Sequence, residues 1–206
     1  MIKKMRFIAA AVAVGLFAAA VVRAEGPAIG SKAPNFSLSD TNGKTHTLSD
    51  YKGRTVVLEW TNFGCPFVVK HYESGNMQSL QKKWAEKGIV WLSICSSAKG
   101  KEGHMTPSEW NKEIAGHKSA STAYLLDESG QVGKSYGAKT TPHMFIIDAK
   151  GSLVYKGAID DKPTYKQSDV KGAHNHVDAA LTDLAAGKPV QKSSTEPYGC
   201  SVKYQK

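Results

Sequence analysis

The sequence predicts an α/β domain built on a mixed β-sheet with helices on both faces. Two apolar, β-branched runs, Thr55 to Trp60 and Ile89 to Cys95, are separated by a segment with helical spacing, which is the pattern of a strand–helix–strand unit. Further along, His143 to Asp148 and Ser152 to Gly157 flank a short turn and predict a hairpin. Because the first unit pairs in parallel and a hairpin pairs antiparallel, the two signals together imply a mixed sheet.

An N-terminal hairpin is expected ahead of the first long strand. Apolar and polar residues alternate towards Leu38, and Asn42-Gly43 favours the positive φ of a tight turn. After the first long strand, apolar residues recur at threes, fours and fives from Pro66 to Lys87. This spacing predicts one helix, which Gly88 ends.

The second half of the chain supplies three further helices and one more strand. Thr106, followed by Pro107 and then by Glu109, is the pattern of a capping box at a helix start. The other elements expected here are a strand from Ala123 to Leu126, a short helix from Gly130 to Tyr136 and a last helix from His176 to Ala186. Helices therefore alternate with strands, as in a sheet that is covered on both faces.

The first residues have the layout of a secretory signal peptide. Three basic residues precede an uninterrupted run of apolar residues and Gly from Phe7 to Val22, and small residues lead to a boundary between Ala24 and Glu25. A membrane span usually needs about 20 apolar residues, so residues 1–24 predict a cleaved signal, with an uncleaved anchor as the alternative. The protein is therefore expected in the periplasm or outside the cell.

Composition and charge limit the remaining classes of function. Residues 25–187 are expected to form one domain and residues 188–206 a polar C-terminal tail, which suits the length of the chain. The net charge of +9 comes from Lys and Arg residues scattered along the sequence, so a nucleic-acid partner is not expected. The chain has three cysteines, Cys65, Cys95 and Cys200. An odd number argues against a disulfide framework and for a reactive thiol.

Four short motifs stand in a characteristic order along the chain. They are Gly30-x-x-Ala33-Pro34-x-Phe36, Asp40-x-x-Gly43-Lys44, Gly64-Cys65-Pro66 after the first long strand, and Thr141-Pro142 before the final hairpin. This set resembles the redoxin branch of the thioredoxin superfamily, the alkyl hydroperoxide reductase and thiol-specific antioxidant (peroxiredoxin-like) group. The resemblance covers about residues 28 to 187. It implies a thioredoxin-like fold with a mixed central sheet flanked by helices, an N-terminal β-hairpin extension and a C-terminal tail.

Cys65 is the candidate nucleophile. It follows a strand and precedes Pro66, so it would cap a helix at the sheet edge where reaction sites gather in open α/β folds. Unpaired N–H groups and the helix dipole stabilise a thiolate at such a position. The resemblance also implies a cis-proline loop at Thr141-Pro142 that faces the cysteine and offers backbone groups to an extended substrate. The residues expected to support this substrate face are Asn62, Gly64, Pro66, Thr141 and Pro142. A buried structural cysteine and an ordinary trans-proline are the alternatives.

Three residues depart from the motifs of the relatives. Val68 stands where a Cys-x-x-Cys motif would have its second cysteine. Asn62 stands where peroxiredoxins have a hydroxyl that orients the peroxide, although its amide could hydrogen-bond in that place. Arg54, the only Arg after the signal, precedes the strand and is expected at its far end. A peroxide and a protein disulfide therefore both remain candidate substrates.

Cys200 is the candidate resolving thiol. A monothiol that reacts with peroxide needs a second thiol to return through a disulfide, and Cys200 lies in a tail that could fold back across the domain. The alternatives are a tail cysteine fixed by packing, a pair with Cys95, and a permanent Cys65–Cys200 disulfide. Cys95 itself reads as a small core residue.

The sequence thus predicts an exported, peroxiredoxin-like thiol oxidoreductase that needs no cofactor and is re-reduced by an external thiol. One alternative is a copper- or zinc-binding module, in which His143 would join the cysteines. Another is a degenerate scaffold without turnover. His71, His174 and His176 are expected at the surface.

Overall fold

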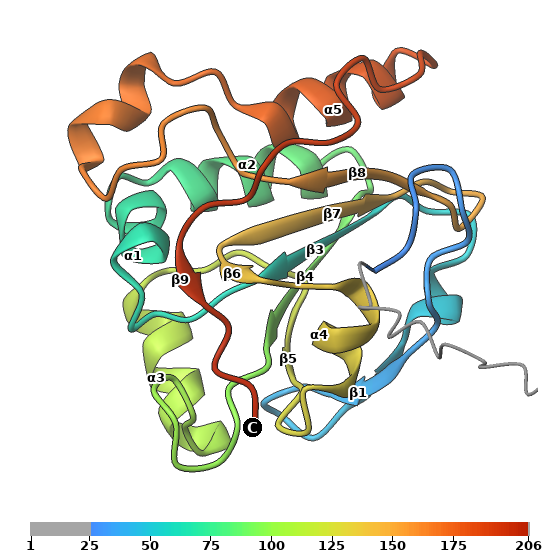
Figure 1. Ribbon diagram of the computed structural model, residues 1–206. Helices are drawn as coiled ribbons and strands as arrows, with labels where there is room; N and C mark the ends of the chain where they lie inside the picture. Colours follow the sequence, from blue (N-terminus) through green and yellow to red (C-terminus); the bar gives the residue numbers. More distant parts are fainter. Residues whose placement is uncertain (1–25, 206) are drawn as a thin grey trace, which may run out of the picture.

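The central sheet has five strands in the order β5-β4-β3-β7-β8 (Figure 1). A computed structural model describes residues 26–205, so the predicted signal peptide lies outside the described residues. The strands are β3 (Val56–Trp60), β4 (Val90–Cys95), β5 (Ala123–Leu126), β7 (His143–Ile147) and β8 (Leu153–Gly157). β3, β4 and β5 pair in parallel, whereas β7 is antiparallel to β3 and β8 to β7. The predicted mixed sheet is confirmed.

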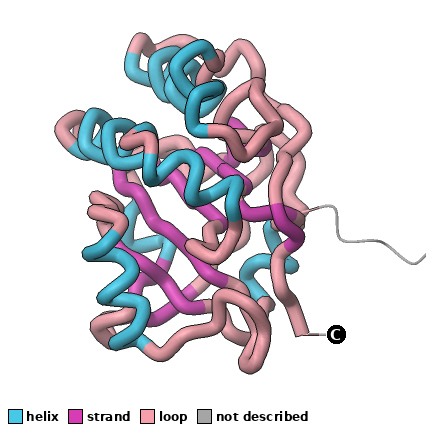
Figure 2. The backbone as a smooth tube through the Cα atoms, turned by 90° about the vertical axis from the view of Figure 1, so that its left-hand side faces the viewer, coloured by secondary structure: helices cyan, strands magenta, loops and turns pink. Residues whose placement is uncertain are grey.

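Helices and loops cover both faces of this sheet (Figures 1 and 2). Because side chains alternate along a strand, Val57 joins one apolar core, and its neighbours Val56 and Leu58 join a second. The first core packs under α1 (Pro66–Glu73), α2 (Asn76–Ala85), α3 (Pro107–Gly116) and α5 (His176–Ala185). The second packs under α4 (Gln131–Tyr136), η1 (Leu48–Tyr51) and the hairpin of β1 (Ser37–Ser39) and β2 (Thr45–Thr47). Another short helix, η2, spans Gln167–Gly172. No helix within residues 26–205 has the length and apolar character needed to cross a membrane.

The helix predicted from Pro66 to Lys87 is two helices in the structure. α1 ends at Glu73 and α2 begins at Asn76. Gly75, between them, has a φ of +74°, in the left-handed region that glycine adopts without steric cost. Apolar residues keep a helical spacing across the break, which is why periodicity alone predicts a single helix.

Two local motifs form as the sequence predicts. In the N-terminal hairpin, Asp40 Oδ1 accepts hydrogen bonds from the backbone N–H groups of Asn42 (2.8 Å) and Lys44 (2.9 Å). At the start of α3, the Glu109 backbone N–H donates to Thr106 Oγ1 at 3.3 Å, and the Glu109 carboxylate accepts from the Thr106 N–H at 2.7 Å. The capping box is therefore complete, and the loop before α3 has a fixed end.

The C-terminal tail crosses the molecule and forms a strand of its own. β9 (Cys200–Ser201) pairs antiparallel with β6 (Thr140–Thr141), which directly precedes β7. In Figure 1 the tail runs down from α5 and passes beside β6 before the chain ends. Neither two-residue strand was expected from the sequence, because such short segments carry no readable periodicity. The pairing brings the tail to the carboxyl end of β3.

Candidate active site

Cys65 lies at the N-terminus of α1, as expected. It is the residue that caps the helix, with Pro66 in the first turn, and its carbonyl accepts the backbone N–H groups of Val68 and Val69, both at 2.9 Å. The side chain is fully buried. Its Sγ donates to the backbone carbonyl of Thr141 at 3.0 Å. The thiol is thus enclosed between a helix N-terminus and β6.

The loop opposite Cys65 contains a cis-proline. The Thr141–Pro142 peptide bond is cis, which confirms the conformation that the resemblance implies. The Thr140 hydroxyl donates to the Pro142 carbonyl at 2.8 Å and braces the loop. Because the Thr141 carbonyl accepts the Cys65 thiol, this loop and the helix N-terminus together form the walls of the site.

Cys200 meets Cys65 through the β6–β9 pairing. In that ladder Cys200 is the direct partner of Thr141, whose carbonyl oxygen lies 3.0 Å from Cys65 Sγ, so the ladder places the two cysteines on either side of Thr141. The pKa of the Cys200 thiol is raised to about 12. Burial is the largest cause, and the hydrogen bond and charge of Cys65 add to it. All three cysteines are reduced in this structure. Cys200 therefore stays protonated in the resting protein.

Gly199 is what lets the tail come this close. A Cβ at Gly199 would lie 2.1 Å from the Thr141 carbonyl oxygen, and its φ of +138° is in a region that other residues rarely adopt. Both limits point to glycine as the only residue that fits here without moving the strand.

Cys95 is not part of this pair. It is the last residue of β4 and belongs to the apolar core, and its Sγ lies 3.6 Å from the Gly103 carbonyl oxygen. Burial raises the pKa of its thiol. The structure thus brings Cys200 to Cys65 and leaves Cys95 as the small core residue that the sequence suggests.

Asn62 and Gly64 shape the turn that presents Cys65. The Asn62 side-chain oxygen accepts the Gly64 N–H at 2.9 Å, and the Asn62 carbonyl accepts the Cys65 N–H at 2.9 Å. The Asn62 amide is buried and packs on Gly103, where a Cβ would come within 2.4 Å of it. Arg54 precedes β3 and therefore lies at the far end of that strand from Cys65, as expected. Its guanidinium group donates to the Gly88 carbonyl.

A buried carboxyl group in β3 escaped the sequence reasoning. The side chain of Glu59 is fully buried and accepts hydrogen bonds from the Trp91 indole N–H (2.7 Å), the Tyr72 hydroxyl (3.0 Å), the Ser93 hydroxyl (3.1 Å) and the Gln81 amide (3.3 Å). We call these five residues the Glu59 network. Burial raises the pKa of Glu59, and the donated hydrogen bonds offset part of the rise. The available signal was a single charged residue inside the apolar run TVVLEW.

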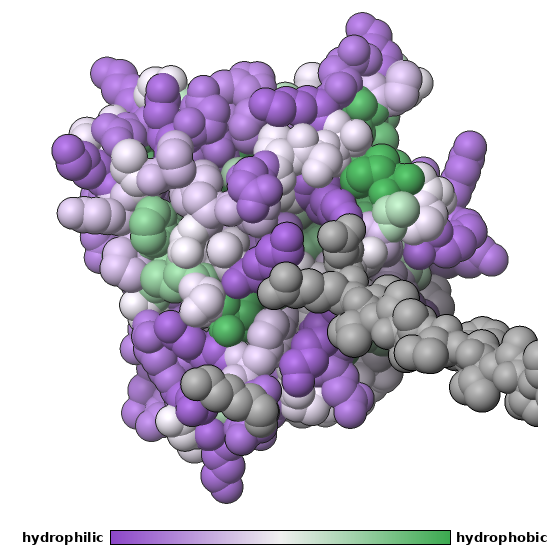
Figure 3. Space-filling model, in the orientation of Figure 1, coloured by the Kyte–Doolittle hydropathy of each residue, from purple (hydrophilic) through white to green (hydrophobic). Residues whose placement is uncertain are grey.

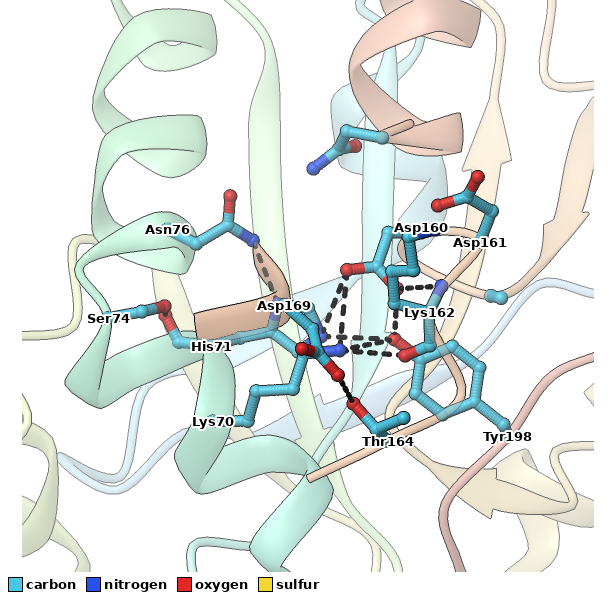
Figure 4. A network of polar contacts seen from close by, with 12 residues as sticks. Lys70, His71, Ser74, Asn76, Asp160, Asp161, Lys162, Thr164, Asp169 and Tyr198 are labelled. Carbon is cyan, nitrogen blue, oxygen red and sulfur yellow. Dashed lines mark hydrogen bonds and ion pairs between the residues drawn. The ribbon is translucent and has the colours of Figure 1, made fainter. Parts of the chain in front are cut away.

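A second buried polar cluster lies between α1, the segment after β8 and the tail (Figure 4). It consists of Lys70, His71, Asp160 and Tyr198, and we call it the ionic cluster. His71 is fully buried, so the expectation of a surface residue is wrong, and His176 is also buried. Burial lowers the pKa of His71 to about 4. Charged and titratable residues placed between apolar ones at helical spacing in α1 could have signalled this cluster.

The histidine nearest the cis-proline does not join the thiols in a metal site. The His143 Nδ1 accepts the Lys139 backbone N–H at 3.2 Å, and burial lowers the pKa of its ring to about 3. Among residues 26–205, no three His, Cys, Asp or Glu side chains gather in a way that could hold a metal ion. The side-chain arrangement therefore gives the metal-binding alternative no support.

Comparison with known proteins identifies the family. The family model described as Redoxin matches residues 28–174. The chain belongs to the Redoxin family. It is 29% identical to the thiol-disulfide oxidoreductase ResA of Bacillus thuringiensis subsp. konkukian over 126 residues, which are 61% of this chain and 67% of ResA. The predicted membership of the thioredoxin superfamily is thereby confirmed.

Two solved structures share the fold over most of the chain. A hypothetical protein from Sinorhizobium meliloti 1021 superposes with a TM-score of 0.73 at 26% identity, covering 87% of this chain and 96% of that one. An uncharacterised conserved protein from Geobacillus kaustophilus also gives a TM-score of 0.73, at 27% identity, covering 86% of this chain and 93% of that one. The Redoxin match and the similarity to ResA support the prediction of a thiol-based oxidoreductase.

Proposed function

We propose that this redoxin is a thiol–disulfide oxidoreductase in which Cys65 is the nucleophile and Cys200 the resolving thiol. One observation carries the proposal: Cys200 lies opposite Thr141 in the β6–β9 ladder, and the Thr141 carbonyl contacts Cys65 Sγ at 3.0 Å. The ResA name of the relative supports the same reaction class. The two thiols act as one redox pair, although the chain lacks a Cys-x-x-Cys motif.

The first step is attack of the Cys65 thiolate on a disulfide of the substrate protein. The sulfur–sulfur bond of the substrate breaks, one substrate sulfur joins Cys65 in a mixed disulfide, and the other leaves as a thiolate that takes up a proton. Cys65 is positioned for this attack at the N-terminus of α1, with Cys200 beside it in the β6–β9 ladder.

The second step is attack of Cys200 on Cys65 Sγ. Once Cys65 is in a mixed disulfide its charge is gone, so two of the causes that raise the pKa of Cys200 disappear, and Cys200 can lose its proton. The Cys65–Cys200 disulfide forms, and the second substrate sulfur leaves and is protonated. One substrate disulfide is reduced, the protein dithiol is oxidised, and an external dithiol regenerates the protein.

Hydrogen peroxide is a second candidate substrate for the same pair. A Cys65 thiolate that attacks hydrogen peroxide breaks its O–O bond, becomes a sulfenic acid and releases hydroxide, and Cys200 would then form the disulfide with loss of water. The placement of Cys200 opposite Thr141 favours this route as much as disulfide exchange. Against it, the Asn62 amide oxygen is already bonded to Gly64 and buried, so the hydrogen bond expected towards a peroxide competes with the turn.

Export to the periplasm or the exterior is the remaining part of the proposal. It rests on the signal-peptide pattern of residues 1–24, on residues 25–187 as the domain, and on residues 188–206 as the tail. An oxidising compartment supplies disulfide substrates to a thiol pair of this kind. Detection of a mature N-terminus at Glu25 in the periplasmic or secreted fraction supports this part, whereas an unprocessed chain in the cytosol contradicts it.

The function is tested by measuring reduction of insulin disulfides with dithiothreitol as the reductant, and peroxide consumption with the same donor. We expect turnover in the wild type, none above background in Cys65→Ser, and the wild-type rate within about twofold in Cys95→Ser, the matched control. Cys200→Ser should accumulate a mixed disulfide at Cys65, seen by mass spectrometry. A Cys200→Ser variant that turns over normally, or a Cys65–Cys95 disulfide in the oxidised wild type, overturns the assignment of the pair.

A further inference from the structure

The tail occupies the only sheet-like edge that faces Cys65 among the described residues. β9 pairs with β6 in an antiparallel ladder, and the Val202 N–H extends it by donating to the Lys139 carbonyl at 3.0 Å. An extended polypeptide that presents a disulfide to Cys65 needs backbone partners of this kind. With the tail in place, however, Cys65 is fully buried and Thr141 is 4% exposed. The tail and an extended substrate therefore exclude each other at β6.

Anchors on both sides of Cys200 hold the tail at this edge. On the C-terminal side, the Tyr204 hydroxyl donates to the Ala138 carbonyl at 2.8 Å, and the Ala98 N–H donates to the Lys203 carbonyl at 2.9 Å. On the N-terminal side, Tyr198 reaches into the ionic cluster, two residues before Cys200. The outer face along which the tail runs is covered mainly by polar residues, with only small apolar patches (Figure 3). Specific polar contacts on both sides of Cys200 thus help to fix the tail.

The ionic cluster is buried and is completed by Tyr198 (Figure 4). Lys70 Nζ lies 3.5 Å from Asp160 Oδ2, and neither side chain is more than 1% exposed. The Tyr198 hydroxyl donates a short hydrogen bond to Asp160 Oδ1 and accepts one from Lys70 Nζ at 3.3 Å. Lys70 also donates to the Lys162 carbonyl at 2.8 Å. Departure of Tyr198 would remove one bond from each member of the ion pair.

A buried ion pair is stable only when its remaining hydrogen-bonding positions are filled, because both charges have lost their water. The phenol of Tyr198 fills two such positions, and its ring packs against Phe67 of α1 at a centroid distance of 5.9 Å. The cluster therefore favours the docked tail, and it does so through Tyr198, a residue that cannot react with a disulfide. Docking of the tail and the thiol chemistry of Cys200 thus depend on different residues and can be tested separately.

We propose that Tyr198 is the positioning residue that holds Cys200 against Cys65, and that a polypeptide disulfide must displace residues 198–201 from β6 to react. The inference rests on the proposed function and specifies how its site is controlled. After the first exchange the substrate strand lifts from β6 while its mixed disulfide still joins it to Cys65, and the phenol returns to the ionic cluster. Cys200 is thereby brought back in register, attacks Cys65 Sγ and releases the substrate as a thiol. The class of substrate is an extended polypeptide segment that carries its disulfide along the β6 edge.

The test measures how often the tail leaves Cys65, in a Cys200→Ser background where no internal disulfide forms. Iodoacetamide labelling of Cys65 is followed by mass spectrometry, and Cys95 in the same molecule reports opening of the fold. Adding Tyr198→Phe removes only the hydroxyl and leaves the contact with Phe67. Because a hydrogen bond to a charged group is lost, we expect Cys65 labelling to accelerate about ten- to a hundredfold, with Cys95 labelling unchanged.

Two further variants keep the result interpretable. Tyr165→Phe is the matched control, since Tyr165 is exposed, contacts the same Phe67 ring, and has no hydrogen bond from its hydroxyl among the described contacts. Gly199→Ala places a methyl group 2.1 Å from the Thr141 oxygen and should lift the strand without touching the ionic cluster. We expect wild-type labelling in the first and accelerated Cys65 labelling in the second.

A peptide probe tests the requirement for displacement. A synthetic decapeptide whose single cysteine carries a 2-thiopyridyl group should react with Cys65 faster in the Tyr198→Phe variant, by about the same factor as iodoacetamide. Equal rates with and without the Tyr198 hydroxyl overturn the proposal, and so does parallel acceleration at Cys65 and Cys95. The proposed function is tested separately: it fails if the wild type forms no Cys65–Cys200 disulfide with any substrate. The labelling rates do not depend on that result.

Discussion

Two buried carboxyl groups, one in β3 and one just after β8, contact the helices that cover one face of the sheet, and they are stabilised in opposite ways. Glu59 receives hydrogen bonds from neutral donors that all belong to α1, α2 and β4, so its network is closed within the core. Asp160 pairs with a charged lysine and depends on Tyr198 from the tail. The Glu59 network belongs to the permanent fold, whereas the ionic cluster is complete only while the tail is docked. The difference identifies which polar site can open in the native protein.

The largest effect is expected for Asp160→Asn, which leaves Lys70 as an uncompensated buried charge. Loss of one partner of a buried ion pair typically costs about 3–5 kcal/mol of unfolding free energy. Urea denaturation measures it, and Asp161→Asn, at the exposed neighbouring position, should cost less than about 0.5 kcal/mol. Labelling of Cys65 should also accelerate more than labelling of Cys95. A loss as small as in the control would show that the ionic cluster is not buried in solution.

Acid should destabilise the protein between about pH 6.5 and pH 4 because of His71. Burial lowers its pKa to about 4 in the folded state, against an ordinary value of 6.5. Between these two pH values the unfolded chain binds more protons than the folded one. The contribution of His71 to the free energy of unfolding is therefore complete above pH 6.5 and decreases as the pH falls. The difference amounts to about 3 kcal/mol. Urea titrations at several pH values should show a shallower slope in His71→Gln, and an unchanged slope would contradict the assignment.

Glu59→Gln should cost about 2 kcal/mol, because the new amide N–H group faces donors that then lack an acceptor. Labelling distinguishes the two carboxyl groups. In Glu59→Gln, iodoacetamide labelling of Cys65 and of Cys95 should accelerate together, since the described donors to Glu59 all belong to α1, α2 and β4 and none to the tail. Glu86→Gln on the exposed end of α2 is the control and should be close to neutral. Selective acceleration at Cys65 would instead connect Glu59 to the tail.

The smallest effect is expected for Tyr204→Phe, on the other anchor of the tail. Its hydroxyl donates to a neutral carbonyl, that of Ala138, so its loss should cost about 1 kcal/mol and raise Cys65 labelling only a few-fold. If this variant releases Cys65 as strongly as Tyr198→Phe, the ionic cluster has no special part in holding the tail.

Much of the fold could be predicted from the sequence because its signals are local. The runs that form β3 and β4 are apolar on both faces, the Thr106 capping box forms within one turn, and Asn42-Gly43 closes the hairpin as expected. The break at Gly75 was missed because a positive φ depends on how the two helices pack, which the spacing of apolar residues does not record.

Site residues could be predicted only where the residue type itself indicates a chemical role. Cys65 at a helix start and the cis-proline at Pro142 follow from the sequence and the family resemblance. Glu59 and Lys70 carry only a weak signal, a charge among apolar residues, and their partners come from distant parts of the chain. Asp160 and Tyr198 carry no signal, because a buried polar residue looks like a surface one in sequence. The contact of Cys200 with Cys65 was a hypothesis that the tail geometry now supports.

The position of the tail has a consequence for heat stability. A bond between Cys65 and Cys200 would close a loop that contains most of the sheet, and chain entropy in such a loop favours the folded state by about 5 kcal/mol. The oxidised protein should therefore melt at a higher temperature than the reduced one. Folding and disulfide reduction are thermodynamically linked, so the more the disulfide stabilises the fold, the harder that disulfide is to reduce in the folded protein. The difference in melting temperature between the oxidised and reduced forms therefore reports on the redox potential of the pair.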